Sequence, residues 1–336
     1  MDLSTNYMGL ALRNPLVASA SPLSYTLDGV RELEEAGVGA IVLFSLFEEQ
    51  LREQAARNAR LVDDPAESFP EAVTYFPEVV EEDSGPHTYL SLLERAASSV
   101  DVPVIASLNG VSPEGWTDYA RAMEDAGASA IELNIYYLPG APEISGRDVE
   151  QRHIDVLARV KAAVSVPVAV KLSPYFSSTA EIALRLQEAG ADGLVLFNRF
   201  LQPDVDSERI ALAPSVALSG PSDGRLPRTW IALLRGRLSV ALAATGGVEA
   251  PADVVNYLLV GADVVMTASS LLRHGPQQAG VLLDGLKAWM TRKGFEDLER
   301  VRGLLAVPHE ADESAYERAG YVTAMRAANA GAFARW

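Results

Sequence analysis

A short phrase that recurs along the chain constrains the fold more than any other feature of the sequence. It joins a helix end, a glycine, a tight turn and an apolar run: EAGVGAIVL at residues 35–43, DAGASAIEL at 125–133, EAGADGLVL at 188–196 and VGADVV at 260–265. Glycine suits this position because the chain leaves a helix through a left-handed conformation. Each apolar run is typical of a strand that is buried on both faces, so the repeat predicts parallel strands alternating with helices.

A second phrase alternates with the first and gives the remaining strands. It reads VPVIAS at 102–107, VPVAV at 166–170 and LSVALA at 238–243. Together with the apolar run at 16–20, the two phrases predict eight strands, near 16–20, 39–44, 103–108, 130–135, 167–172, 193–197, 239–244 and 263–267. Eight strand–helix units in one chain favour an α/β fold of the (β/α)8 TIM-barrel type. The alternative is an open doubly wound sheet, which is disfavoured because no early GxGxxG turn follows a strand.

The segments around these strands complete the expected layout. Residues 3–14 predict a short hairpin before the barrel, and amphipathic patterns predict helices at 114–126, 149–163, 178–189, 251–259 and 277–292. Two connections are long, at 45–100 and 198–226, and both leave from C-terminal strand ends, so we expect lids over one site. We divide the chain into a barrel at 1–292 and a helical extension packed on the barrel at 293–336.

Composition excludes several classes of protein. The 336 residues include no cysteine, which rules out disulfides, iron–sulfur clusters and thiol catalysis, and a net charge of −17 makes broad nucleic-acid binding an unsuitable role. Neither a secretory signal nor an apolar run of membrane-spanning length is evident, so we expect a cytoplasmic protein without membrane contact. The four histidines lack metal-ligand spacing and we expect no metal; His153 is expected on a helix surface, and His87 lies in the first lid.

One lysine stands where barrels carry their chemistry. The run VPVAVKLSPYF at 166–176 predicts a buried strand that ends at Ser173 and Pro174, so Lys171 lies near its C-terminal end. A lysine there is costly to bury unless an anion or an electron-rich ligand accompanies it. The alternative is a buried stem whose amine reaches solvent.

Other polar residues follow the strands at the same end: Ser19, Ser21, Ser45, Asn109, Asn134, Asn198 and Thr245 to Gly247. Side-chain amides offer one acceptor and two donors each, which suits a planar, amide-like ligand. Alternatively, each asparagine caps the helix that follows it. The glycine pair after the seventh strand and the MTASSL segment at 266–271 match the place where barrels often hold a phosphate.

Five of these stretches resemble the dihydroorotate dehydrogenases, and most of all the soluble class. They are NPLVASA at 14–20, ELNI at 132–135, VKLSPYF at 170–176, LSGP at 218–221 and TGGV at 245–248, in order across residues 4–290. The resemblance implies an FMN-binding barrel and a homodimer. It also implies dihydroorotate oxidation to orotate in pyrimidine biosynthesis. An NAD-linked relative would work with a partner subunit that carries iron–sulfur and flavin groups.

By this resemblance, the FMN contacts are Ala18, Ser19, Ser45, Asn109, Asn134, Lys171, Ser219, Gly220, Gly246, Gly247, Ala268 and Ser269. Lys171 would lie at the N1/O2 edge of the flavin, where positive charge stabilises the reduced anionic ring. Gly246, Gly247, Ala268 and Ser269 would hold the phosphate. Asn134 would face both the flavin and the substrate, and Asn198 would orient the substrate.

The catalytic loop departs from the family pattern. Phe44 and Ser45 stand where the family has a Lys-Ser pair, and Tyr137 stands where the catalytic cysteine would be. A tyrosine has an ordinary pKa of about 10, so as a base at neutral pH it needs a strong downward shift. Tyr136 or Tyr137 could instead stack on a substrate or donate a proton to a product; alternatively both pack in a lid.

Three functions stay open on these residues. In the first, an FMN-dependent oxidoreductase exchanges hydride with a small-molecule substrate, and Tyr137, Lys171 and Asn134 are the catalytic residues. In the second, a lyase or aldolase barrel forms a Schiff base at Lys171. In the third, a non-catalytic barrel keeps a flavin or phosphate ligand and acts through a partner. The resemblance favours the first.

Overall fold

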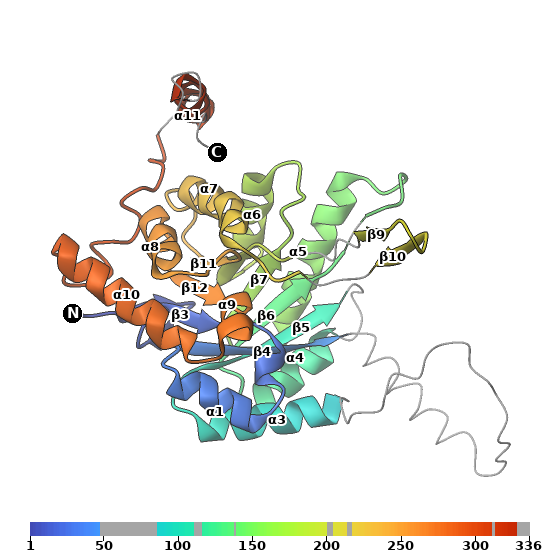
Figure 1. The fold of residues 1–336 in the computed structure, drawn as a ribbon. Helices are drawn as coiled ribbons and strands as arrows, with labels where there is room; N and C mark the ends of the chain where they lie inside the picture. The colour runs from blue at the N-terminus through green and yellow to red at the C-terminus, as the bar shows by residue number, and fades with distance from the viewer. Residues whose placement is uncertain are drawn as a thin grey trace, which may run out of the picture.

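The computed structural model describes residues 1–47, 86–110, 116–137, 139–199, 204–213, 217–310 and 313–327, and its centre is a closed barrel of parallel strands. Figure 1 shows helices arranged around this barrel. The strand order is β11-β12-β3-β4-β5-β6-β7-β8, which closes the predicted eight-stranded barrel. The bounds are β3 Leu16–Ala18, β4 Ala40–Phe47, β5 Val104–Gly110, β6 Ala130–Ile135, β7 Val168–Leu172, β8 Gly193–Leu196, β11 Ala241–Thr245 and β12 Val264–Thr267.

The helices that surround the barrel include all five that the sequence predicts: α4 (Trp116–Asp125), α5 (Gly146–Ala163), α6 (Thr179–Glu188), α8 (Pro251–Val260) and α10 (Gln278–Lys293). Four further helices had not been assigned: α1 (Leu27–Glu35), α3 (Pro86–Ser99), α7 (Arg225–Leu234) and the short α9 (Ser269–His274). α3 lies within the stretch that we had interpreted as the first lid, which is therefore partly helical. α1 is capped by Thr26, whose side chain accepts a hydrogen bond from Gly29 N.

Side chains alternate between two cores along each strand, as the two-residue period of a strand requires. One face points outward to the helices and forms the main apolar core. The other face fills the barrel with small and branched residues, among them Val17, Val42, Ile105, Ala169 and Val195. Towards the C-terminal strand ends this inner face becomes polar, which is where the candidate site lies.

The predicted N-terminal hairpin is present and packs into the barrel interior. It consists of β1 (Thr5–Tyr7) and β2 (Leu10–Leu12), which pair antiparallel. Tyr7 and Met8 belong to the apolar cluster inside the barrel. Gly193 of β8 leaves room for this hairpin, since a Cβ there would lie 2.9 Å from Met8 Sδ.

Buried charges hold the hairpin in place. Thr5 Oγ1 donates to the backbone oxygen of Asp263 at 3.1 Å. The Asp263 carboxylate lies 2.8 Å from Arg235 Nη1 and 3.5 Å from Arg302 Nε. Burial lowers the pKa of Arg302, and the charge of Asp263 opposes that shift. Asp2 N also donates to Glu296 O at 2.9 Å, so both ends of the described barrel region meet here.

The long connections are only partly described. Residues 48–85, which hold the charged helix pattern and the acidic stretch of the first predicted lid, lie outside the described residues. The second connection contains a hairpin, β9 (Asp204–Asp206) with β10 (Ala211–Ala213), and a 3-10 turn η2 (Pro221–Gly224). Ile210 at the hairpin tip is 90 % exposed.

The C-terminal region begins against the barrel and then leaves it. Leu298 and Val301 are buried in the main core. α11 (Glu313–Ala327) stands apart from the other helices in Figure 1. The division at residue 292 remains a prediction. Among the described residues, no helix combines the length and the apolar character needed to cross a membrane.

The expectation of a surface position for His153 is wrong. The residue is 2 % exposed and lies on the inner side of α5, where its ring meets Phe176 edge-on at 5.2 Å. Nδ1 is 2.8 Å from Val149 O, while Nε2 is buried without a partner among the described residues. Burial is the main cause that lowers the pKa of His153, and the nearby Arg152 charge adds to it.

Candidate active site

Three of the predicted site residues form one row across neighbouring strands. Asn109 of β5 is paired in register with Asn134 of β6, and Asn134 is paired with Lys171 of β7. Residues paired in register point to the same face of a sheet, here the inside of the barrel. The register therefore brings two amides and an amine together at the C-terminal end, where barrels carry their active sites.

A fourth predicted residue joins this row from across a strand. Asn198 follows β8, and its Nδ2 donates to Asn134 Oδ1 at 2.7 Å. The backbone N of Asn198 donates to Leu172 O at 2.7 Å, which fixes where the loop leaves the barrel. Asn134 thus does not serve as a helix cap; its side chain pairs with a second amide. Within the described part of the chain, the pair leaves the Asn134 NH2 and the Asn198 Oδ1 for other partners.

Lys171 has a buried carboxylate as its neighbour. Its Nζ lies 3.2 Å from Glu132 Oε1, and the side chains are 9 % and 1 % exposed. Glu132 Oε2 has no hydrogen-bond partner among the described residues. Glu132 is two residues before Asn134 on the same inward face, so it lies one layer below the row of amides. The predicted need for an anion beside Lys171 is met, in part, from within the chain.

Serine hydroxyls continue this lower layer. Ser45 of β4 and Ser107 of β5 are paired in register, and their hydroxyls lie 2.8 Å apart. Ser107 N donates to Tyr89 OH at 2.9 Å. Burial raises the pKa of Tyr89 well above its ordinary value, so its phenol stays protonated. Ser45 is therefore engaged below the rim rather than in the cavity described next.

A cavity of about 130 Å³ opens above Lys171. It is lined by Lys171, Phe197, Asn198, Arg199, Ser219, Thr245, Gly246, Val248, Thr267, Ala268 and Ser269. A second cavity of about 160 Å³ shares five of these residues and extends towards Tyr175 and Leu226. Six predicted site residues thus face one space, although they come from four different strand ends.

The glycine pair and two serines form one corner of this space. Gly246 and Gly247 have φ of +92° and +67°, a region that glycine adopts at no steric cost. Gly247 N donates to Ser219 Oγ at 3.3 Å, and Ser219 Oγ lies 3.0 Å from Ser269 Oγ. A Cβ on Gly247 would lie 2.3 Å from Gly224 N, so this loop packs tightly against η2.

Side chains from outside the loop fix its backbone. The Tyr257 hydroxyl donates to Gly246 O at 2.6 Å, and burial raises the pKa of Tyr257 well above its ordinary value. Arg273 donates to Ser219 O at 3.3 Å and forms an ion pair with Glu249. The loop is thus held from α8 and α9, and its remaining groups face the cavity.

The two tyrosines after β6 lie at the rim. The Arg152 guanidinium of α5 lies 4.1 Å from the centre of the Tyr137 ring. Tyr136 and Tyr137 are both half-buried, and neither lines the cavity above Lys171.

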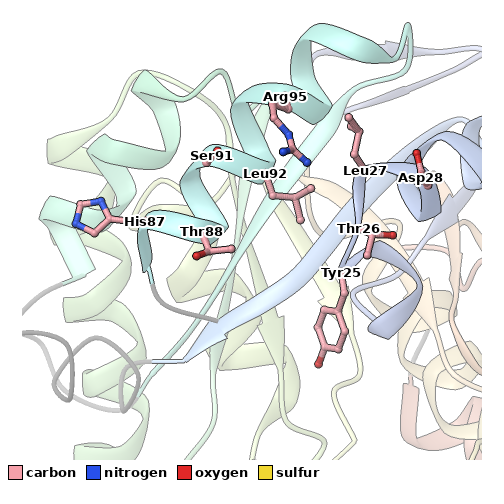
Figure 2. Close-up of a pocket in the computed structure, with 9 residues that line it drawn as sticks. All are labelled: Tyr25, Thr26, Leu27, Asp28, His87, Thr88, Ser91, Leu92 and Arg95. Atoms are coloured by element: carbon pink, nitrogen blue, oxygen red, sulfur yellow. The ribbon is translucent and has the colours of Figure 1, made fainter. Parts of the chain in front are cut away.

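Phe44, which replaces a lysine of the family pattern, belongs to an aromatic row. Its ring meets Tyr25 edge-on at 4.5 Å and Tyr89 edge-on at 5.0 Å. Tyr25 also lines a separate cavity of about 730 Å³ between the start of α1 and α3, shown in Figure 2. His87 points away from the other labelled residues there and does not line the cavity above Lys171.

Other predicted contacts lie close to the cavity without lining it. Ala18 is paired in register with Thr267, and Ser19 N donates to Thr267 O at 3.0 Å. Gly220 N donates to Asp223 Oδ2 at 2.8 Å and caps η2. None of the three predicted contacts, Ala18, Ser19 and Gly220, lines the cavity itself. The sequence analysis missed Glu132, Phe197 and Arg199; for Glu132 the signal was a single charge inside the apolar run of residues 130–135.

Comparisons with known proteins agree on one family. The model of the family described as "Dihydroorotate dehydrogenase" matches residues 2–290. The catalytic subunit of dihydroorotate dehydrogenase B (NAD(+)) from Methanocella arvoryzae is 30 % identical over 319 residues, which cover 90 % of this chain and 98 % of that protein. The corresponding subunit from Methanothermobacter thermautotrophicus is 27 % identical, with 90 % and 98 % covered. The NAD-dependent dihydropyrimidine dehydrogenase subunit PreA of Escherichia coli is 24 % identical, with 90 % and 76 % covered.

Proposed function

The chain belongs to the dihydroorotate dehydrogenase family, and from that premise we propose that it is an FMN-dependent oxidoreductase acting on a CH–CH bond of a cyclic amide. The observation that carries this proposal is the convergence of Lys171, Asn198, Gly246 and Ser269 on one cavity. Backbone that is free of side chains and a hydroxyl suit a phosphate, while a lysine and a side-chain amide suit the polar edge of a planar ring.

The residues present fit FMN on two grounds. The Gly246–Gly247 corner exposes backbone to the cavity, and a Cβ on Gly246 would meet no atom within 4 Å, so a phosphate can approach closely. The Ser219 and Ser269 hydroxyls lie beside this corner as further donors. Lys171, which lines the same cavity, supplies the positive charge that suits the N1/O2 edge of the ring.

When bound, FMN supplies hydride chemistry at its ring. The chain's own side chains would orient the substrate. The Asn134–Asn198 pair presents one NH2 group and one carbonyl oxygen, which complement a planar amide that has an acceptor beside a donor. We assign Tyr137 as the group that moves a proton, with Tyr136 against the substrate, because Tyr137 occupies the place of the family's catalytic cysteine.

Dihydroorotate is the first substrate to test, and dihydrouracil is the second. Dihydroorotate is suggested by the relatives named as dihydroorotate dehydrogenases. Dihydrouracil is suggested by the relative named as a dihydropyrimidine dehydrogenase subunit. The two substrates differ by a carboxylate, which requires a cation. Phe44 stands where the family pattern has a lysine, while Arg199 lines the cavity and can take that role. Because the row of Tyr25, Phe44 and Tyr89 contains no cation, dihydrouracil, which has no carboxylate, is the alternative substrate.

Two other functions make different demands. A Schiff-base lyase needs a Lys171 amine that is free to attack a carbonyl, whereas Lys171 Nζ is held by the buried Glu132 carboxylate at 3.2 Å. A non-catalytic barrel would bind flavin in the same cavity, but no substrate would reduce that flavin. Homodimer formation is part of the proposal and is tested by sedimentation at several protein concentrations.

An anaerobic absorbance spectrum of the purified protein tests the proposal. We expect flavin bands that bleach when dihydroorotate or dihydrouracil is added, and the substrate that bleaches them faster identifies the class. Bands that persist with both would support the non-catalytic barrel. Absence of flavin after reconstitution with FMN, together with borohydride trapping of a carbonyl substrate at Lys171, would replace the proposal by the lyase.

A further inference from the structure

Glu132 is a charged residue inside the barrel, and its hydrogen-bond partner within the described residues is Lys171. It lies inside the barrel with an exposed side-chain fraction of 1 %, and its Oε2 has no partner within the described residues. Its register neighbours are Ser107 on β5 and Ala169 on β7. Burying a carboxylate costs several kcal/mol unless a counter-charge accompanies it, so a residue that served packing alone would be apolar here.

The ionisable groups near Glu132 also indicate that Lys171 is its counter-charge. Below it, Tyr7 OH is buried without a partner among the described residues. Burial, and after it the negative charges of Glu132 and Asp263, raise the pKa of Tyr7, so the phenol stays neutral. Lys171 is therefore the cation at hydrogen-bond distance from Glu132, and it lies on the cavity side. Lys171 lines the cavity and Glu132 does not, so the carboxylate acts on the ligand space through that amine.

We propose that Glu132 is a positioning residue that sets the charge Lys171 presents to the cavity, and thereby the reduction potential of bound FMN. This inference rests on the proposed FMN site. Entry of two electrons and one proton into bound FMN adds one negative charge to the ring. A lysine alone would favour that charge strongly; a carboxylate 3.2 Å from the amine partly cancels it.

The variant Glu132→Gln removes the negative charge of Glu132 and keeps the size of its side chain. Glutamine keeps an oxygen that can accept from Lys171 Nζ, but it carries no charge. We expect the midpoint potential of the FMN-loaded variant, measured against reference dyes at neutral pH, to shift to more positive values. Glu132→Asp keeps the charge and should remain closer to the native protein. A merely structural pair would lower the stability of both variants and leave the potential unchanged.

Glu150→Gln is the matched control. Glu150 is also buried and also forms an ion pair, with Arg185 Nη1 at 3.1 Å, but it lies on α5 outside the barrel. This variant loses a paired carboxylate without touching Lys171. Its midpoint potential should equal that of the native protein, and a shift as large as that of Glu132→Gln would overturn the inference.

A second readout needs no flavin. Acetic anhydride acylates an amine that is free to attack, and a hydrogen bond to a charged carboxylate, here at 3.2 Å, holds the amine more firmly than one to a neutral amide oxygen. In the FMN-free protein, competitive labelling should acylate Lys171 several-fold faster in Glu132→Gln than in the native protein or in Glu150→Gln. Equal labelling, or an unchanged potential, would overturn the inference. Failure of the native protein to bind FMN would sink the proposed function separately, and the labelling result would still decide the pairing.

Discussion

The Asn198 side-chain amide donates to the Asn134 amide oxygen at 2.7 Å, although β7 lies between β6, which carries Asn134, and β8, which Asn198 follows. Each amide fixes the orientation of the other, so the pair presents a preset donor and acceptor. We expect Asn198→Ala to lower kcat/KM by about tenfold to a hundredfold, the ratio that corresponds to ~1–3 kcal/mol of lost hydrogen bonding. Steady-state kinetics with the better of the two substrates measures it. The exposed Asn256→Ala is the control, and an equal loss in both variants would contradict a role in substrate orientation.

Gly247→Ala should destabilise the protein and weaken FMN retention. The φ of +67° is unfavourable for alanine, and the new Cβ would lie 2.3 Å from Gly224 N. Together these effects should lower the free energy of unfolding by about 2 kcal/mol or more. Urea denaturation and the bound-flavin ratio measure the two effects. Gly146→Ala, at an exposed position with nothing within 4 Å, should change neither.

Tyr137→Phe tests the assigned proton-transfer group. Phenylalanine keeps the ring that faces the Arg152 guanidinium at 4.1 Å and removes only the hydroxyl. If Tyr137 moves a proton, kcat should fall by roughly 10²-fold or more, with little change in FMN binding. Stopped-flow reduction of the flavin separates this step from product release. The exposed Tyr321→Phe serves as control, and an unchanged reduction rate in Tyr137→Phe would place the proton-transfer group elsewhere.

His153 should make the stability of the protein depend on pH. Burial lowers the pKa of His153 from its ordinary value of 6.5. Above pH 6.5 the ring is neutral in both folded and unfolded chains. As the pH falls through 6.5, the unfolded chain binds a proton that the folded protein does not, so the free energy of unfolding decreases. His153→Gln should lose this part of the decline between pH 6.5 and the lower, folded pKa.

Urea titrations at a series of pH values measure that decline. The control is His309→Gln, because His309 is exposed and the hydrogen bond that it accepts from Arg237 ends on its backbone oxygen. A decline of equal size in His153→Gln and the native protein would show that other groups cause it.

The barrel could be predicted because its signals are local. Glycines at helix ends and short apolar runs recur with the spacing of single strand–helix units, and each unit can be identified alone. The position of Lys171 followed from the same logic, since Ser173 and Pro174 mark the strand end. α3 was missed because the connection was interpreted as one lid, although α3 begins at Pro86 and proline is a common first residue of a helix.

The remaining features depend on what packs against each residue. His153 has a polar ring, which suggested the surface, but its spacing places it on the buried stripe of α5 with Val156 and Leu157. Phe176, from the loop after β7, packs edge-on against that ring. The pairing of Asn134 with Asn198 requires the register of three strands, which the sequence does not encode locally. Glu132 looked like an irregularity in an apolar run because its partner lies 39 residues further along the chain.

The bond from Asp2 N to Glu296 O has a consequence for how the molecule is made. During synthesis the hairpin emerges first, whereas Asp263, Glu296 and Arg302, which hold it, emerge among the last residues of the barrel region. The N-terminal hairpin therefore cannot form these contacts until nearly the whole chain has left the ribosome. Contacts of such long sequence separation also form slowly. A nascent chain truncated before residue 296 would expose an open barrel end, which makes chaperone capture most useful at that stage.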